Sequence, residues 1–101
     1  MDMNKMMKEA RKMQAELAKV QEEAELLTAE GTAGGGVVTA VATGKNVIES
    51  ISIDPSVIDP DDIEMLEDLI TAAVNEALRS VQEIAAIKME AITGNLNIPG
   101  F

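Results

Sequence analysis

The sequence contains no cysteine and no histidine, and Phe101 is its only aromatic residue. Without cysteine the chain has no disulfide, no thiolate nucleophile and no cysteine-ligated metal. Without histidine it lacks the commonest general base and the commonest ligand of transition metals. A single aromatic residue also leaves no set of rings on which nucleic-acid bases could stack. These absences predict a protein that is not an enzyme and that holds no metal and no cofactor.

Long apolar runs are missing as well. No stretch approaches the roughly 20 residues that a membrane-spanning helix needs. The N-terminus alternates methionine with Asp, Asn and Lys, and it lacks the apolar core of a signal peptide. We therefore expect a soluble, cytoplasmic protein without a membrane partner.

What the chain does contain is aliphatic and unevenly charged. Its 101 residues are 47% hydrophobic, which is enough for a modest core in a single domain over residues 1–101. The net charge is −10, yet residues 1–20 hold five basic and three acidic side chains. Residues 21–101 hold three basic and fifteen acidic ones. Positive charge is thus concentrated at the N-terminal end of an acidic chain.

Residues 1–28 are predicted to form a long helix. They hold no Gly or Pro, and their apolar residues recur at alternating steps of three and four. These positions form a heptad seam that consists of Met3, Met6, Ala10, Met13, Leu17, Val20, Ala24 and Leu27. A single apolar stripe on a helix about 40 Å long suits a coiled-coil-like partner better than a deep core.

The same helix carries a basic stripe made of Lys5, Lys8, Arg11, Lys12 and Lys19. Its four lysines fall within about 60° of one another on a helical wheel, and the arginine lies about 60° further round. Such a stripe is most often a solvated helix face whose lysines pair with acids at i,i+4, as Lys5–Glu9 and Lys12–Glu16 allow. The other interpretation is contact with nucleic acid, which a net charge of −10 opposes at long range.

The middle of the chain predicts a small antiparallel sheet within residues 29–53. Three consecutive glycines at 34–36 favour a turn, and Gly44-Lys45-Asn46 is a candidate hairpin turn. The expected strands are residues 28–33, 37–43 and 47–53. Alternation along the last strand predicts Val47, Ile51 and Ile53 on one face, with Ile48, Ser50 and Ser52 on the other.

A second long helix is predicted over residues 59–92. Asp59 would be its N-cap and Pro60 its first residue, and Thr93-Gly94 would stop it before a tail over residues 93–101. Its apolar residues span an arc of about 140°, wide enough to cover a sheet and to meet another helix. At about 45 Å the helix is longer than strands of seven residues, so one end must project or pack on another subunit.

The aspartates near the second helix need a separate explanation. Asp54, Asp59, Asp61 and Asp62 could form a carboxylate pair or a magnesium site. Two of them precede prolines and the others fall in the first turn of the predicted helix, so capping is the better interpretation. The glycine-rich segment lacks the Lys-Ser/Thr of a phosphate-binding loop, which leaves no visible catalytic machinery.

The order of these segments resembles the YbaB/EbfC family of bacterial nucleoid-associated proteins over essentially the whole chain. The most specific strings are the glycine-rich LTAEGTAGGGVVTAVATG, the strand end Ile53-Asp54-Pro55-Ser56 and the helix string DDIEMLEDLITAAVNEA. The first helix, with MKEARKMQAELAKVQEE, and the ending NIPGF agree with the same family. The first helix alone would not identify it.

The resemblance implies a fold and a function. The fold would be α+β, with a long N-terminal helix, a three-stranded antiparallel sheet and a long C-terminal helix, and it would assemble as a tweezer-like homodimer. The function would be that of a nucleoid-associated protein that binds double-stranded DNA through the phosphate backbone, largely without sequence preference. The residues that match the projecting arms of the family are Lys5, Lys8, Arg11, Lys12 and Lys19.

A shortage of basic residues in the second helix limits that expectation. Residues 79–92 offer only Arg79 and Lys88 as basic residues, whereas members of the family often carry several there. The alternative is a protein-interaction or assembly module whose heptad seam docks a partner helix without direct DNA binding. No small-molecule substrate is evident in either case.

Overall fold

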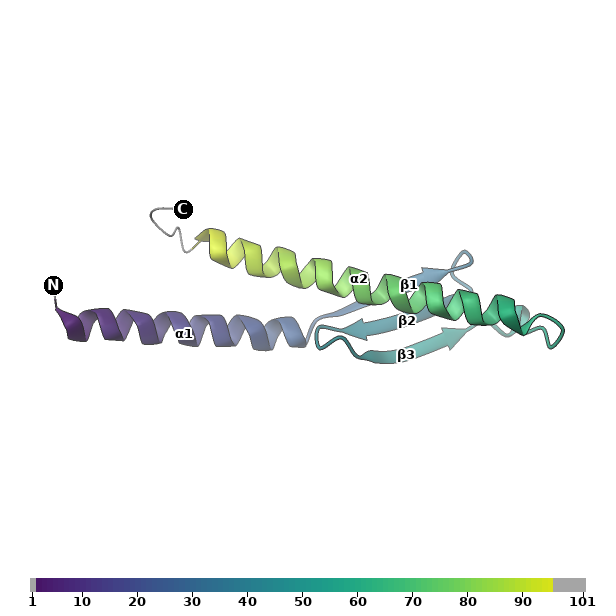
Figure 1. Ribbon diagram of the computed structural model, residues 1–101, viewed down its shortest axis with the longest axis horizontal. Helices are drawn as coiled ribbons and strands as arrows, with labels where there is room; N and C mark the ends of the chain where they lie inside the picture. Colours follow the sequence, from purple (N-terminus) through teal and green to yellow (C-terminus); the bar gives the residue numbers. More distant parts are fainter. Residues whose placement is uncertain (1, 96–101) are drawn as a thin grey trace.

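The computed structural model describes residues 2–95, which form two long helices and a small sheet (Figure 1). In chain order the elements are α1 (Met3–Glu25), β1 (Thr28–Ala33), β2 (Val38–Thr43), β3 (Ile48–Ile53), the short 3-10 helix η1 (Pro55–Val57) and α2 (Ile63–Asn95). The predicted α+β fold with a long helix at each end of a three-stranded antiparallel sheet is confirmed. The molecule measures 74 × 23 × 15 Å, because α1 and the end of α2 both extend past the sheet.

The sheet is a meander in the order β1-β2-β3, and both strand pairs are antiparallel. The first hairpin turns through Gly34, Gly35 and Gly36, whose φ angles of 63°, 75° and 97° are costly for residues that carry a Cβ. The second turns through Asn46, whose φ is 62° and whose N–H donates to the carbonyl of Thr43 at 2.9 Å. Both predicted turns are confirmed.

One irregularity interrupts the pairing of β2 with β3. The register pairs Val41 with Ser50, and the next residue along β2, Ala42, pairs with Ile48. Glu49 is therefore an extra residue on β3, which is the arrangement of a β-bulge. An extra residue shifts the alternation of side chains by one, so residues before and after the bulge exchange faces.

The bulge corrects the predicted faces of β3. Ile48 packs with Ile53 against the buried core, although strict alternation puts the two on opposite faces. Val47, predicted to share the apolar face, is instead 55% exposed in the turn before the strand. The prediction was wrong for Ile48 and Val47 because a bulge leaves no mark in an apolar-polar pattern.

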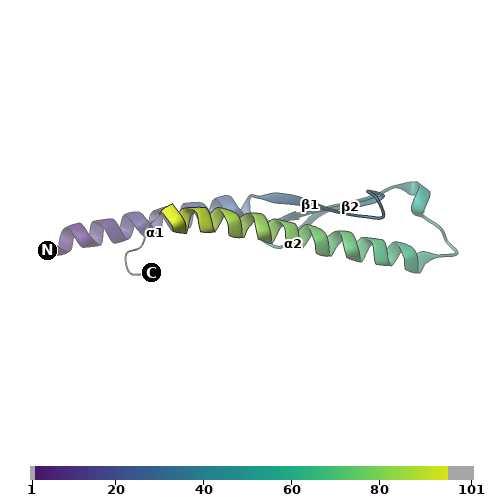
Figure 2. The same cartoon turned by 90° about the horizontal axis from the view of Figure 1, so that it is seen from above.

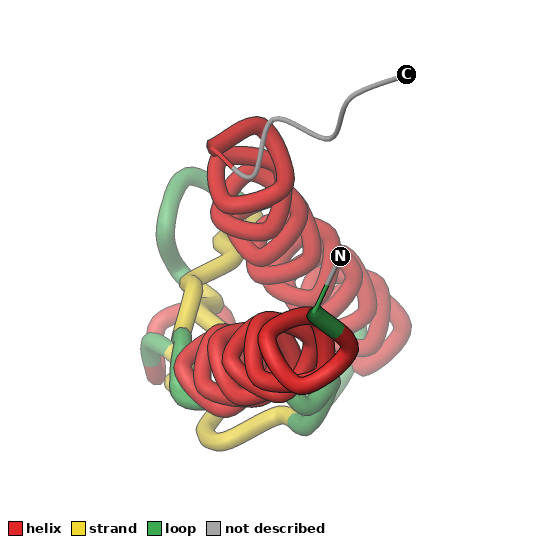
Figure 3. Tube along the Cα trace, turned by 90° about the vertical axis from the view of Figure 1, so that its left-hand side faces the viewer, coloured by secondary structure: helices red, strands yellow, loops and turns green. Residues whose placement is uncertain are grey.

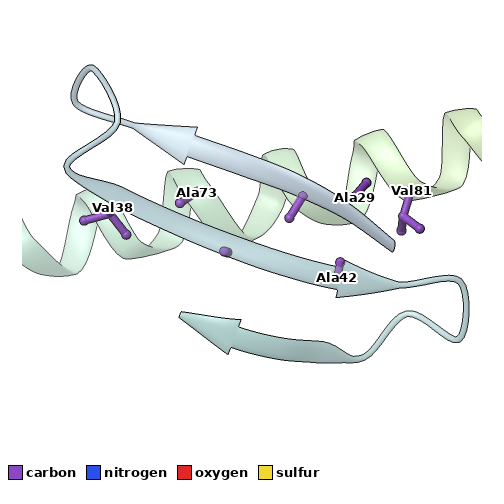
Figure 4. Packing of buried hydrophobic residues seen from close by; sticks show 7 residues of the cluster. Ala29, Val38, Ala42, Ala73 and Val81 are labelled. Carbon is purple, nitrogen blue, oxygen red and sulfur yellow. The ribbon is translucent and has the colours of Figure 1, made fainter. Parts of the chain in front are cut away.

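α2 lies along one face of the sheet and packs mainly over β1 and β2 (Figure 2). The buried cluster between them consists of Ala29, Val38, Ala40, Ala42, Ala73, Ala77 and Val81 (Figure 4). Because most of these side chains are single methyl groups, the helix and sheet backbones approach closely. A Cβ on Gly31 of β1 would overlap the backbone nitrogen of Ala77 and the carbonyl oxygen of Ala73. Glycine at position 31 is therefore required by the distance between sheet and helix.

α2 begins after Asp62 rather than at Pro60. The carboxylate of Asp62 accepts the backbone N–H of Met65 at 3.2 Å, which is the hydrogen bond of an N-cap. Asp59, the predicted N-cap, instead accepts the N–H of Asp61 at 2.9 Å in a separate turn that contains the proline. The type of start signal was correct, but the acid that makes it was misplaced because several aspartates in a row offer the same chemistry.

The far end of α2 also differs from the prediction. The helix runs through Thr93 and Gly94 to Asn95, so the predicted stop is wrong. A glycine inside a helix costs about 1 kcal/mol relative to alanine, which weakens a helix without ending it. The rest of the predicted tail, residues 96–101, lies outside the described residues.

The base of α1 is seated on the sheet. α1 ends at Glu25, earlier than predicted, because Leu27 already belongs to the body. The carbonyl of Leu27 accepts the N–H of Gly44 at 2.8 Å, and its side chain packs against the buried cluster. A Cβ on Gly44 would overlap the carbonyl of Ala24, whose carbon would lie 2.7 Å away. The turn between β2 and β3 is therefore in direct backbone contact with the last turn of α1.

Candidate nucleic-acid interface

Beyond this seat, α1 extends away from the sheet (Figure 1). Viewed along the molecule, α1 and α2 are two separate columns that diverge toward their free ends (Figure 3). Every side chain from residue 2 to residue 19 is exposed, and Val20 is the one buried residue of α1. We call residues 3–19 the α1 arm. An element of this kind adds little to the core and leaves its surface available for recognition.

The α1 arm carries the whole of the predicted basic stripe, and all five of its side chains are exposed. Lys5, Lys12 and Lys19 recur every seven residues, which places them about 10.5 Å apart along one side of the helix. With Glu9 and Glu16 as its acids, the arm has a net charge of +3 on a chain of −10. Folding therefore separates a basic element from an acidic body.

Two ion pairs join residues within 2–95, and neither involves the stripe. Arg79 Nη1 lies 2.9 Å from Glu83 Oε1, and Lys88 Nζ lies 3.3 Å from Glu23 Oε2. The i,i+4 acids that the sequence offers to the stripe lysines are not in ionic contact with them in the described chain. The cations of the stripe thus face solvent, whereas the two basic side chains of α2 are each next to a carboxylate.

The ion pair between Lys88 and Glu23 is the feature that the sequence did not reveal. It joins the C-terminal half of α2 to the last turn of α1. The two residues belong to different helices that a three-stranded sheet separates along the chain, and helical periodicity relates only residues of one helix. The scarcity of basic residues in α2 was the one signal that pointed to Lys88.

The aspartate cluster has a structural role. Asp54 accepts the N–H of Ser56 at 2.9 Å and caps η1, and Asp59 and Asp62 cap the turn and the helix that follow. The backbone N–H of Ser56, and after it the hydroxyl of the same residue, lower the pKa of Asp54. The capping interpretation is confirmed for these three side chains.

Two other kinds of site find no support in the part of the chain that the structure describes. Within residues 2–95 no group of three or more acidic side chains is arranged to hold a metal ion. None of the described helices is both long enough and apolar enough to cross a membrane. The exposed basic stripe is therefore the strongest candidate for a functional site.

Similar proteins give this candidate a context. A nucleoid-associated protein of Desulforamulus reducens is 59% identical over 99 residues, which cover 98% of this chain and 94% of that protein. One from Thermoanaerobacter pseudethanolicus is 54% identical over 99 residues, covering 98% of this chain and 89% of the relative. The crystal structure of an uncharacterized protein from Helicobacter pylori matches with a TM-score of 0.67 at 21% identity. It covers 95% of this chain and 97% of the other, and it supports the fold.

The match to a family is equally extensive. Residues 1–96 fit the profile of a family described as the YbaB/EbfC DNA-binding family. This range includes the α1 arm, the sheet and the whole of α2. The resemblance inferred from the glycine-rich segment and the second-helix string is thereby confirmed. This chain belongs to the YbaB/EbfC DNA-binding family.

Proposed function

We propose that this protein is a nucleoid-associated protein that binds double-stranded DNA with the α1 arm. The observation that carries the proposal is the exposed basic stripe, unpaired within the described chain, on a projecting helix. The contacting residues would be Lys5, Lys8, Arg11, Lys12 and Lys19. The family to which the chain belongs and the names of its relatives support the same function.

The composition of the stripe favours the phosphate backbone over base edges. Four of its five cations are lysines, whose ammonium groups are compact point charges rather than planar forks. Contacts of this type fix a protein on the duplex without reading its sequence. The α1 arm also lacks aromatic side chains that could stack on exposed bases. We therefore propose largely sequence-independent binding, in the cytoplasm and at the nucleoid.

A homodimer is part of this proposal, because the rest of the chain is acidic and repels DNA, while a single arm carries a charge of only +3. Two arms on one particle would double the local positive charge and span more phosphates. The body offers an apolar surface for such pairing around the end of β3 and the start of α2, where Ile51, Ile58 and Ile63 are each about half exposed. Sedimentation at micromolar concentration should give the mass of two protomers, and the mass of one would contradict the dimer.

DNA binding is tested by reversing charge on the stripe. Replacing Lys8 and Lys12 together with glutamate should weaken binding to a duplex of arbitrary sequence by about 100-fold or more at low salt, because neutralised phosphates dominate the affinity. The plot of log K against log salt concentration should also become flatter, by about 2 for each protomer. A mobility-shift titration at several salt concentrations measures both quantities.

The matched control changes the same charge at another place. Lys45 and Arg79 are exposed and lie outside the α1 arm, in the β2–β3 turn and on α2. Their joint replacement by glutamate alters the net charge as much as the stripe variant does. It should reduce the affinity far less and leave the salt dependence nearly unchanged. Equal losses in the two variants would show that net charge, and not the stripe, governs binding.

A further inference from the structure

The heptad seam of α1 remains uncovered along the arm. Met3, Met6, Met13 and Leu17 are 74%, 50%, 40% and 40% exposed, although each belongs to one regular apolar stripe. An open groove runs along this side of the arm, and it is lined by Met6, Glu9, Ala10, Lys12, Met13 and Glu16. Exposed methionines that lie in a row form an adaptable surface for apolar partners. The arm thus has a second surface, which meets the basic stripe at Lys12.

The two flanks of this seam differ in charge. On one flank Glu9, Glu16 and Glu23 recur every seven residues, and we call them the acidic column. The positions of the other flank, Met7, Gln14 and Gln21, are uncharged. In coiled coils the residues beside the apolar seam set the choice of partner through charge. The pattern on α1 therefore selects a helix that brings positive charge to one side.

One contact of this kind is already present within the protomer. Glu23, the member of the acidic column nearest the body, lies 3.3 Å from Lys88 of α2. Beside it Val20 of the seam is buried at 8% exposure. α2 therefore contacts the base of α1 through a lysine on the acidic column. Glu9 and Glu16, further out, have no cation within ion-pair distance among residues 2–95.

The helix opposite the arm is also apolar and uncovered. Past Val81, where α2 leaves the sheet, Ile84 and Ile87 are 42% and 65% exposed. They belong to the C-terminal half of α2, whose end diverges from α1 (Figures 1 and 3). Exposed apolar side chains at helical spacing are the kind of surface that the apolar face of another helix can cover.

From these observations we propose that the seam of the α1 arm docks an amphipathic helix of another protein, with lysine or arginine along one flank of its apolar face. The partner would extend the contact that α2 makes at Glu23 outward along α1. Its cations would pair with Glu9 and Glu16, and its apolar residues would cover Met6 and Met13. The net charge of −10 would attract such a partner at long range.

The charge pattern disfavours the other occupants. A second α1 in antiparallel register would place one acidic column against the other, and in parallel register it would oppose acids to uncharged residues. DNA would be repelled by the same carboxylates. The centre of the seam lies about 130° from the lysines of the stripe on a helical wheel, so a helix and a duplex can occupy the arm together. Of the stripe residues, Lys12 alone also lines the groove.

A pair of designed peptides tests the proposal. Both would be labelled helices of about three heptads with the same leucine and alanine seam. The basic peptide carries lysine at the flanking positions, and the acidic peptide carries glutamate there. Fluorescence anisotropy with the full-length protein should show that the basic peptide binds at least about tenfold more tightly. Equal affinity for the two peptides, or no binding of either, would overturn the proposal.

Charge reversal on the column makes the test specific to this surface. Glu9→Lys with Glu16→Lys should invert the preference, so that the acidic peptide binds more tightly. Glu22→Lys with Glu76→Lys makes the same change in net charge at exposed positions off the seam, and it should keep the preference for the basic peptide. If both variants behave alike, the protein attracts the basic peptide through net charge alone and has no docking site.

Removing the apolar contact separates this site from DNA binding and from dimerisation. Met6→Gln with Met13→Gln keeps two good helix formers. It should weaken binding of the basic peptide by about tenfold, while the affinity for DNA and the sedimentation mass stay unchanged. A variant that instead falls from dimer to monomer would show that a second copy occupies the seam, against the proposal. Because the stripe is intact, a failure here leaves the proposed DNA contact standing.

Discussion

The body and the α1 arm are both built from small or flexible aliphatic side chains, but they use them in opposite ways. In the body, alanines and valines are fully buried between α2 and the sheet, and glycine at position 31 lets the backbones meet. On the arm, methionines repeat as regularly and remain in solvent. The difference teaches that regular apolar spacing predicts a surface to be covered, but it does not say which molecule covers it.

The largest expected effect is a loss of stability in the body. Gly31→Val inserts a side chain where the backbones of Ala73 and Ala77 already fill the space, so α2 must move away from β1. We expect the free energy of unfolding to fall by about 3 kcal/mol or more, as in severe overpacking. Urea unfolding followed by circular dichroism measures this loss.

A glycine outside the helix–sheet contact provides the control. Gly35 has a φ of 75°, and a Cβ on this residue would meet no atom within 4 Å. Alanine at this position is therefore disfavoured only by the positive φ of the backbone. Gly35→Ala should lower the free energy of unfolding by about 1 kcal/mol. A loss at Gly31 no greater than this would show that the close approach of α2 to β1 is not needed.

The next prediction compares truncation of an aliphatic side chain to alanine in the body and on the α1 arm. Val81→Ala removes two methyl groups from a fully buried site and should cost about 2 kcal/mol. Leu17→Ala removes more atoms from the seam, yet it should cost about 0.5 kcal/mol or less, because that side chain is 40% exposed. Both values come from urea unfolding of the protein without ligand. A cost at Leu17 near that at Val81 would mean that the arm is covered in solution.

The smallest effect concerns an exposed cap at the edge of the body. The pKa of Asp54 is lowered from 3.8, so its carboxylate stabilises the fold above that pH and loses this contribution as the pH falls through the lowered pKa. In Asp54→Asn this side chain no longer responds to pH. The difference in the free energy of unfolding between the variant and the wild type should therefore change below about pH 4. Urea midpoints between pH 7 and pH 2 test this.

Ser56→Ala is the matched control for this measurement. It removes the hydroxyl but keeps the backbone N–H, which is the larger cause of the lowered pKa. It should therefore retain most of the acid sensitivity of the wild type. The same acid dependence in the wild type and in Asp54→Asn would exclude a role for this carboxylate.

Much of this comparison could be predicted from the sequence. Heptad spacing and good helix formers predicted α1, and the glycines at 34–36 and Gly44-Lys45-Asn46 marked both hairpin turns. These features are local, since each depends on residues within one or two turns of chain. The basic stripe could be recognised for the same reason, because helical periodicity alone determines which side chains share a face.

The rest depends on contacts that local patterns do not encode. The bulge at Glu49 moves Ile48 to the core face, and Asp62 rather than Asp59 caps α2. The bulge belongs to the pairing of β3 with β2, and several aspartates in a row offer the same capping chemistry. The pairing of Glu23 with Lys88 likewise needs the sheet to bring the two helices together. Whether the stripe binds DNA stays a prediction, since geometry supplies the charges but not the ligand.

The contact between Gly44 and Ala24 fixes the base of the α1 arm against the turn between β2 and β3. From that seat to Met3 the helix is about 31 Å long, so a tilt of about 10° would swing its tip by about 5 Å. That distance is close to the width of the minor groove, about 6 Å. Gly44, which lies outside both the basic stripe and the heptad seam, therefore sets where the arm points. A side chain introduced at position 44 would change where the basic stripe lies without altering any residue of the stripe.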